Sequence, residues 1–143
     1  MADISFNEEV AQRFINAPKG GGGGLPDYLG FEIFEAGPGT MKGRFEVRKD
    51  LLTGFGNMHG GVLSAFCDHM LGCVCYPAMA KGQWAATTEF KINLTAPVSS
   101  GVVEAHAEIL NMTRRQAVVR IDLLNDGRTV AMAQGTVTIR DPR

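Results

Sequence analysis

Residues 60–80 are apolar almost throughout and contain a single acidic side chain, Asp68. An apolar segment of this length predicts a helix that is buried on nearly all sides. A charge within such a helix costs free energy unless it has a partner or a chemical role. We therefore expect a helix over about residues 60–79, loosened in its last turn by Pro77, with the rest of the chain folded around it. A membrane span is not expected, because the length is marginal and Asp68, His69 and Pro77 interrupt it.

The segments on both sides of this helix alternate between apolar and polar residues, with the period of two that is typical of strands. Strands are predicted at residues 29–35, 40–47, 85–94, 102–110, 117–124 and 128–140. Turn signals separate several of them, such as Gly37-Pro38-Gly39 and Asn125-Asp126-Gly127. Consecutive strands joined by short turns pair antiparallel. The predicted fold class is therefore α+β, with a long central helix wrapped by an antiparallel sheet of about six strands.

The 143 residues are expected to form one domain, residues 1–143. Its N-terminal part, residues 1–18, predicts a helix over 3–17 that Asp3 or Ser5 caps. A glycine-rich connector at 19–27 then leads to a core at 28–140. The glycine run at 20–24 lacks both the Gly-x-Gly-x-x-Gly spacing and a following Lys-Ser/Thr, so a phosphate-binding loop is not expected there.

Charge and cysteine content exclude several classes of protein. The net charge is −1 and no basic tract carries interleaved aromatic residues, so we expect no nucleic-acid partner. Cys67, Cys73 and Cys75 lie in the apolar segment and form no Cys-x-x-Cys pair, which favours buried thiols in a reducing compartment and no metal site. The N-terminal residues lack the order of a signal peptide. A cytoplasmic location is expected.

The sequence His59-Gly60-Gly61 stands at the start of the predicted helix. The first N–H groups of a helix lack internal partners and carry partial positive charge. Glycine lets a ligand carbonyl approach them closely, so the segment can form an oxyanion hole for acyl transfer. The alternative is a tight loop-to-helix turn that His59 caps.

Asp68 follows within the same helix and could act as a general base or a nucleophile. Alternatively, a polar group of a neighbouring subunit satisfies it. His69 points about 100° away around the helix, which favours a packing or surface role. One of Thr87 and Thr88 should face inward and could position a water molecule, although strand propensity explains threonine equally well.

Arg114 and Arg115 are adjacent at a predicted turn. Paired arginines suit phosphate recognition, and a solvated turn is the ordinary alternative.

Taken together, His59-Gly60-Gly61, Asp68 and the strand segment Thr87-Thr88-Glu89-Phe90-Lys91-Ile92-Asn93-Leu94-Thr95-Ala96-Pro97 resemble the hotdog-fold acyl-CoA thioesterases. The branch that they resemble most includes the phenylacetate-pathway and 4-hydroxybenzoyl-CoA-type enzymes. The similarity covers about residues 28–140. It implies a hotdog fold that pairs into homodimers or homotetramers, with active sites at the dimer interface.

The resemblance also implies roles for single residues. The Gly60 N–H would polarise the thioester carbonyl, beside Gly61, and His59 would orient the loop or the thioester. Asp68 of the partner subunit would activate water or attack the carbonyl, and Thr87 would hold the water. Arg114 and Arg115 would bind phosphates of coenzyme A. Relatives often carry an asparagine where this chain has Thr53, so either Thr53 or Asn57 is expected to serve as the polar partner.

The function expected from this resemblance is hydrolysis of an acyl-CoA to a free acid and coenzyme A, without a metal or redox cofactor. A hotdog dehydratase or hydratase, and a non-catalytic acyl-CoA-binding module, are the alternatives. Phe55, Phe66, Met70 and Cys73 are expected to line the acyl pocket, which favours an apolar or aromatic acyl group.

Overall fold

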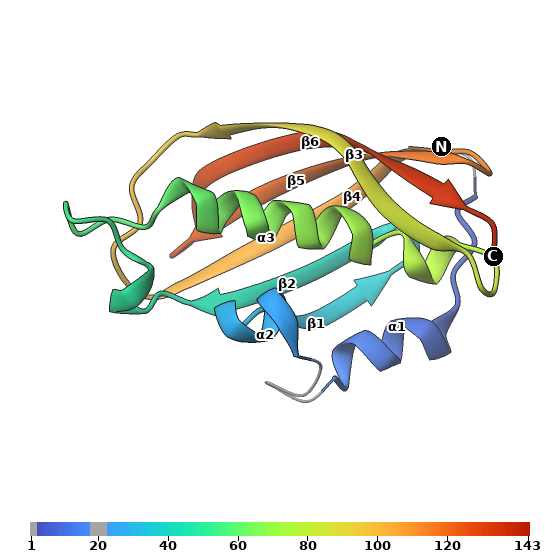
Figure 1. The fold of residues 1–143 in the computed structure, drawn as a ribbon, viewed down its shortest axis with the longest axis horizontal. Coiled ribbons are helices and arrows are strands. Elements are labelled where there is room, and N and C mark those ends of the chain that lie inside the picture. Colours follow the sequence, from blue (N-terminus) through green and yellow to red (C-terminus); the bar gives the residue numbers. More distant parts are fainter. Residues whose placement is uncertain (1–2, 18–22) are drawn as a thin grey trace.

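The structure is a computed structural model that describes residues 3–17 and 23–143. The elements follow in the order α1 (Glu8–Ile15), α2 (Gly24–Leu29), β1 (Glu32–Gly37), β2 (Thr40–Glu46), α3 (Gly60–Cys73), β3 (Trp84–Leu94), β4 (Val102–Met112), β5 (Gln116–Asn125) and β6 (Arg128–Arg140). Short 3-10 turns occupy Lys49–Leu51 and Tyr76–Ala78. Figure 1 shows α3 lying along the concave side of the sheet. No helix in the described part of the chain is both long enough and apolar enough to cross a membrane.

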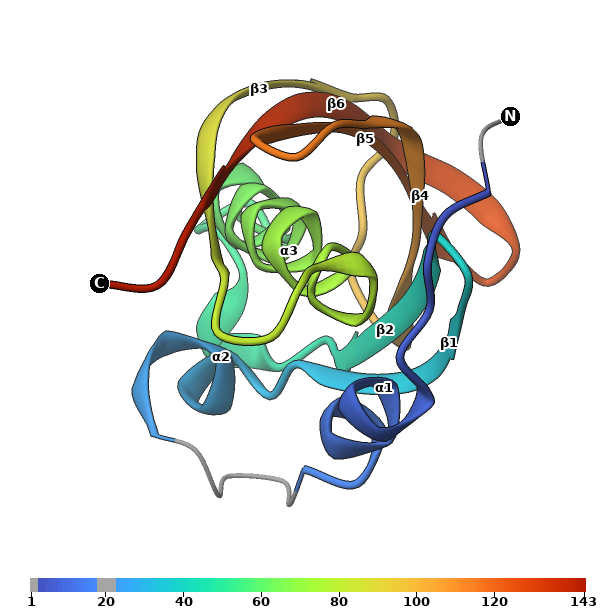
Figure 2. The same ribbon diagram turned by 90° about the vertical axis from the view of Figure 1, so that its right-hand side faces the viewer.

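The six strands form one antiparallel sheet in the order β1-β2-β4-β5-β6-β3. Figure 2, which views α3 nearly end-on, shows this sheet curving around the helix. The predicted α+β hotdog architecture is confirmed. Within the sheet β1 and β3 are the edge strands, and β3 lies beside β6 although the two are far apart in sequence.

The core lies between α3 and the concave face of the sheet. On α3, the side chains of Leu63, Phe66 and Met70 are buried. Every second residue of the central strands meets them, as the alternation in the sequence predicts. Phe31, Phe45 and Phe66 form an aromatic cluster with ring centroids 4.7–5.3 Å apart. Burying one such side chain contributes about 1.5–3 kcal/mol to the free energy of unfolding.

The central helix is shorter than predicted. It ends at Cys73 rather than near residue 79. The Cys75 N–H bonds to the Gly72 carbonyl and the Ala78 N–H to the Cys75 carbonyl, which is the tighter 3-10 spacing. Pro77 has no N–H to continue an α-helix, so the chain turns at Tyr76–Ala78 instead.

The N-terminal segment also differs from the prediction. Helix α1 begins at Glu8, and Asn7 caps it by accepting a hydrogen bond from the Val10 N–H (3.1 Å). Neither Asp3 nor Ser5 is the cap. The Ser5 hydroxyl donates to the Ala78 carbonyl (2.9 Å) and the Asn7 N–H to the Pro77 carbonyl (2.7 Å). Residues 3–7 therefore bind along the 3-10 turn that follows α3.

Helix α2 was not predicted, because six residues are too few to display a helical period. It lies partly within the expected connector at 19–27, whose residues 19–22 are outside the described residues. Gly30 closes α2 in the left-handed conformation (φ 78°), as glycines do after a helix.

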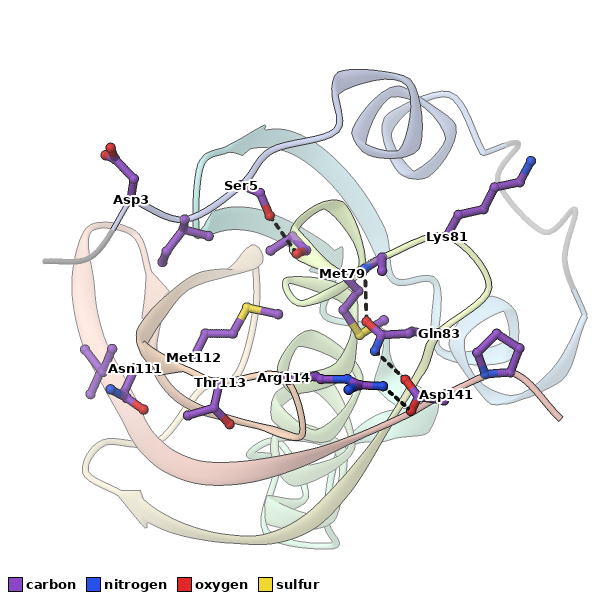
Figure 3. A pocket seen from close by; sticks show the side chains of 15 residues that line it. Asp3, Ser5, Met79, Lys81, Gln83, Asn111, Met112, Thr113, Arg114 and Asp141 are labelled. Carbon is purple, nitrogen blue, oxygen red and sulfur yellow. Dashed lines mark hydrogen bonds and ion pairs between the residues drawn. The ribbon is translucent and has the colours of Figure 1, made fainter.

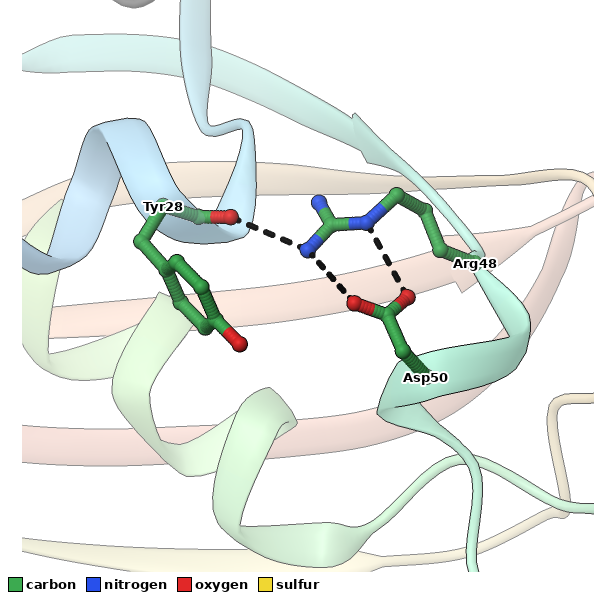
Figure 4. A network of polar contacts seen from close by, with 3 residues as sticks. All are labelled: Tyr28, Arg48 and Asp50. Carbon is green, nitrogen blue, oxygen red and sulfur yellow. Dashed lines mark hydrogen bonds and ion pairs between the residues drawn. The ribbon is translucent and has the colours of Figure 1, made fainter.

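Arg48 links α2 to the loop that precedes α3, as Figure 4 shows. Its guanidinium donates to the Tyr28 carbonyl (3.0 Å) and to both carboxylate oxygens of Asp50 (3.2 and 3.3 Å). The hydrogen bonds from Arg48 lower the pKa of Asp50. From the adjoining turn, the Leu51 carbonyl accepts the His59 N–H (3.1 Å). One hydrogen-bonded unit thus runs from the end of α2 to the start of α3.

Candidate active site

His59 caps the start of α3 with its side chain. Its Nδ1 accepts the Gly61 N–H (2.9 Å), and its carbonyl accepts the Val62 N–H (3.0 Å). A ring nitrogen that accepts a hydrogen bond carries no proton, so the neutral imidazole holds its proton on Nε2. Within residues 3–17 and 23–143, no acceptor is present for the Gly60 N–H. Gly60 therefore offers a free donor at the positive end of the helix.

Thr53 and Asn57 close the loop that precedes His59. The Thr53 N–H donates to the Asn57 carbonyl (2.7 Å), and the Thr53 hydroxyl to Asn57 Oδ1 (3.2 Å). The same hydroxyl accepts the Phe55 N–H (3.2 Å). Phe55 stands at the tip of this loop with 97% of its surface exposed. Both polar side chains are thus used in shaping the loop.

A wide, open groove of about 500 Å³ runs between α3 and β3. From α3 it is lined by residues at i, i+3, i+4 and i+7, which share one face of a helix: Gly61, Ser64, Ala65 and Asp68. From β3 it is lined by Thr87, Thr88, Glu89 and Phe90. The structure therefore brings Gly61, Asp68 and Thr87 together. The described lining does not include His59, Gly60, Thr53 or Asn57.

Asp68 is exposed in the single chain, which corrects the expectation that the helix buries it on nearly all sides. The sheet covers one side of α3, and the side that carries Gly61, Ser64 and Asp68 is left facing the groove. Ser64 and Glu89 were not identified from the sequence. Helical spacing could have placed Ser64 beside Asp68, because residues four apart are neighbours.

A bulge in β3 sets the direction of the threonines. The register with β6 shifts between Thr87 and Glu89. Thr88 shares a hydrogen bond with the Thr138 hydroxyl, and Glu89 accepts one from the Thr136 hydroxyl (2.7 Å). In the described ranges, no hydrogen-bond or ion-pair partner is recorded for the Thr87 hydroxyl or the Asp68 carboxylate. Two free polar groups line one groove, and such a pair can hold a water molecule and accept its proton.

The free Gly60 N–H and the Asp68 carboxylate belong to different positions along α3. Eight residues separate them, which corresponds to about 12 Å along a helix axis. An oxyanion donor lies about 3 Å from the reacting oxygen, and a general base reaches the carbonyl directly or through one water molecule. Their spacing along α3 therefore favours an arrangement in which the two groups that act on one carbonyl come from different copies of the chain.

His69 and the cysteines are packing residues. The His69 ring lies 5.5 Å from the Phe31 ring and its Nε2 is 3.5 Å from Cys73 Sγ. Burial lowers the pKa of His69, and the charge of Asp68 offsets part of that shift. Burial raises the pKa of Cys67, Cys73 and Cys75 to about 12, so these thiols are poor nucleophiles. Among the residues that the structure describes, no group of three His, Cys, Asp or Glu side chains could hold a metal ion.

The expected acyl-pocket residues of α3 and the two arginines lie outside the groove. Phe66, Met70 and Cys73 face the sheet and are buried in the core, so they do not line the groove of the described chain. Arg114 forms an ion pair with Asp141 (3.0 Å) and lines a separate cavity, while Arg115 is exposed. Neither arginine is among the described residues of the groove.

Comparison with known proteins matches this chain to a large enzyme family. The model of the thioesterase superfamily matches residues 55–132, which is more than half of the chain. A Mycobacterium tuberculosis protein given the provisional name of esterase is 27% identical over 116 residues, covering 79% of this chain and 82% of that protein. A variant of the phenylacetic acid degradation protein PaaI from Thermus thermophilus has a TM-score of 0.72 at 30% identity, covering 79% of this chain and 96% of that one. A thioesterase from Haemophilus influenzae has the same fold, with a TM-score of 0.77 at 24% identity over 81% of this chain and 82% of that one.

Proposed function

Because the chain belongs to the thioesterase superfamily, we propose that it hydrolyses an acyl-CoA thioester to a free acid and coenzyme A. The observation that carries the proposal is the free carboxylate of Asp68 beside the free hydroxyl of Thr87 in an open groove. A thioester needs an attacking water and a donor for the developing oxyanion. The groove can hold and activate the water, and the free N–H at the start of α3 can act as the oxyanion donor.

In this proposal two copies of the chain complete each site. The Gly60 N–H of one copy donates to the thioester oxygen, and the Nε2–H of His59 helps to orient the thioester. Asp68 of the second copy acts as base or nucleophile, with Thr87 holding the water. The thiolate of coenzyme A leaves and takes up a proton. The separation of Gly60 and Asp68 along α3 supports the involvement of a second copy.

The first test of the proposal replaces Asp68. Asp68→Asn keeps the size of the side chain and removes its basicity, so thiol release from an acyl-CoA is expected to fall about 100- to 10,000-fold. Asp122→Asn, a carboxylate paired with Arg120 on β5, is the control and should retain wild-type turnover. Wild-type turnover by Asp68→Asn would contradict the proposed chemistry. Substrate binding without thiol release in the wild type would favour a binding module instead.

A second test removes the proposed oxyanion donor itself. Position 60 is the first residue of α3, where proline is tolerated, and His59 has the extended backbone (φ −63°, ψ 127°) that suits a following proline. Gly60→Pro deletes the N–H and should lower kcat about 100- to 1,000-fold. Gly60→Ala is the matched control, since its Cβ meets the same flexible Leu94 side chain but its N–H remains. Equal rates for the two variants would show that this N–H is not used.

A panel of acyl-CoA substrates would identify the preferred acyl group. The related Thermus thermophilus protein is named for phenylacetic acid degradation, which supports placing phenylacetyl-CoA in the panel beside straight-chain acyl-CoAs. Phe90 in the groove and the exposed Phe55 ring offer apolar contacts that suit such groups. The ratio of kcat/KM values across the panel would then rank the substrates.

A further inference from the structure

A second cavity, of about 780 Å³, lies at the end of the curved sheet where α3 stops. Its walls come from residues 3–5, the connection from α3 to β3, the end of β4 with the turn after it, and residues 141–142 (Figure 3). Among the described residues, it has no lining residue in common with the groove of Asp68 and Thr87. Cavities of this volume are in the range that binds small ligands.

One side of this cavity is apolar. Ile4 and Met112 are half-buried and pack against the core, Met79 does the same from the connection after α3, and Leu110 is exposed on β4. The two thioethers are flexible and adapt to apolar ligands of different shape. An apolar ligand body of several carbons would therefore find favourable contacts here.

The opposite edge is a chain of hydrogen bonds that fixes the polar groups. The Gln83 amide oxygen accepts the Ala80 N–H (3.0 Å), and its nitrogen donates to Asp141 (2.9 Å). Arg114 donates to the other Asp141 oxygen (3.0 Å). Figure 3 shows Arg114 extending along the cavity toward Asp141. The hydrogen bond from Gln83 and the charge of Arg114 lower the pKa of Asp141, which keeps it a carboxylate.

The Arg114 guanidinium has hydrogen-bond donors left over at this edge. Arg114 uses one terminal nitrogen for Asp141, and the described residues provide no acceptor for its Nε–H or its other NH₂ group. Lys81 also lines the cavity, but Figure 3 shows its side chain extending away from Arg114. Asp3 lies across the cavity from Arg114 in Figure 3. A ligand head that binds the remaining N–H groups of Arg114 must therefore accept hydrogen bonds.

From this arrangement we propose that the cavity is a second ligand site, which binds an apolar molecule carrying one carboxylate. The carboxylate accepts hydrogen bonds from the free N–H groups of Arg114, while the body lies on Met79, Leu110 and Met112. Arg114 is already paired with Asp141, so a ligand with a single negative charge meets less repulsion at this edge than a phosphate dianion would. The site is independent of the proposed hydrolysis.

Octanoate is the probe, and octanol and octylamine are controls that have eight carbons but a different charge. Binding is measured by isothermal titration calorimetry and by fluorescence of Trp84, the single tryptophan, which follows Gln83 in the chain. Octanoate should bind more tightly than either control. From hexanoate to octanoate the affinity should rise about fourfold per buried methylene. Equal affinity for octanol, or no saturable binding of octanoate, would overturn the proposal.

Variants locate the site. Arg114→Gln removes the proposed donors and should weaken octanoate binding about fivefold, because the side chain is largely exposed. Arg115→Gln makes the same charge change at the neighbouring residue, which does not line the described cavity, and should bind octanoate as the wild type does. Leu110→Asn should also weaken binding, while leaving the discrimination between octanoate and octanol in place. Equal effects of the two arginine variants would contradict the site.

Coenzyme A tests whether the cavity is instead part of the thioester site. In the proposed arrangement, a saturating concentration of coenzyme A leaves octanoate binding unchanged. Full displacement of octanoate by coenzyme A would overturn the second site, and would assign Arg114 to the nucleotide of the substrate. Because this experiment measures binding and not turnover, the second ligand site can be disproved while the proposed hydrolysis of acyl-CoA stands. The proposed hydrolysis can likewise be disproved while the second site stands.

Discussion

Asp68 and His69 are adjacent on α3, yet their surroundings differ in ways that matter for function. Asp68 is exposed on the groove side, whereas His69 is largely buried against Phe31 and Cys73. The motif His59-Gly60-Gly61 and the acid were both identifiable in the sequence, because a helix start and a lone carboxylate are local features. Which side of α3 the sheet covers is a tertiary property, so the exposure of Asp68 could not be predicted from the apolar pattern.

His69 is expected to make the stability of the fold depend on pH. Burial lowers its pKa below the ordinary value of 6.5. Between the two values the unfolded chain binds more protons than the folded one, so the free energy of unfolding falls as the pH drops through 6.5 toward the lowered pKa. His69→Gln cannot titrate, so the wild type should lose stability relative to this variant between pH 7.5 and pH 5.5. Urea denaturation of both proteins at the two pH values measures this difference in the free energy of unfolding. An equal loss in the wild type and in His69→Gln would contradict the lowered pKa of His69.

At the scale of elements, α3 and β3 line the groove. Where neighbouring elements pack closely, a glycine leaves room because it has no side chain. The strands and the central helix were predicted because alternation and apolar runs are visible over a few residues. The short helix α2, the early end of α3 and the bulge in β3 were not. Each depends on a cap, a proline or a register that pairing with a distant segment sets.

Gly135 on β6 is expected to be required for the path of β3. A Cβ at this position would lie 2.5 Å from the Glu89 carbonyl oxygen and 2.5 Å from the Phe90 Cβ, which are fixed parts of the strand. Gly135→Ala should lower the free energy of unfolding by about 1–3 kcal/mol. Gly72→Ala is the control within α3, where a Cβ meets nothing within 4 Å, and it should raise stability by about 0.5–1 kcal/mol. Urea denaturation at one protein concentration compares them, and an unaffected Gly135→Ala would contradict the described packing.

The thiols of α3 and its C-terminal extension are expected to be unreactive in the folded protein. Cys67, Cys73 and Cys75 are buried and their pKa values are raised to about 12, so almost no thiolate forms near pH 8. A disulfide reagent should label none of them rapidly in the native state and all three after unfolding in urea. Rapid labelling of one thiol in the native protein would place that cysteine at an accessible surface.

At the scale of the whole molecule, the strand order leaves β3 at one edge of the sheet, next to the groove. The sequence predicted antiparallel pairing through its short turns, but nothing local predicts that β3 lies beside β6. Arg114, which was expected to bind phosphates of coenzyme A, lines a cavity separate from the groove, and its expected role stays a prediction. An edge strand beside an open groove is a surface that a second copy of the chain can cover.

Mixing two inactive variants tests whether each site is shared between two copies. Gly60→Pro lacks the proposed donor but keeps Asp68, and Asp68→Asn keeps the donor. In a mixed dimer, one site combines both defects and the other combines the intact Gly60 of one chain with the intact Asp68 of its partner. Random pairing makes half of the dimers mixed, so thiol release should recover to about a quarter of the wild-type rate.

Co-refolding of differently tagged variants, followed by purification through both tags, isolates the mixed species. If it is as inactive as its parents, the pairing of Gly60 of one copy with Asp68 of the other must be abandoned.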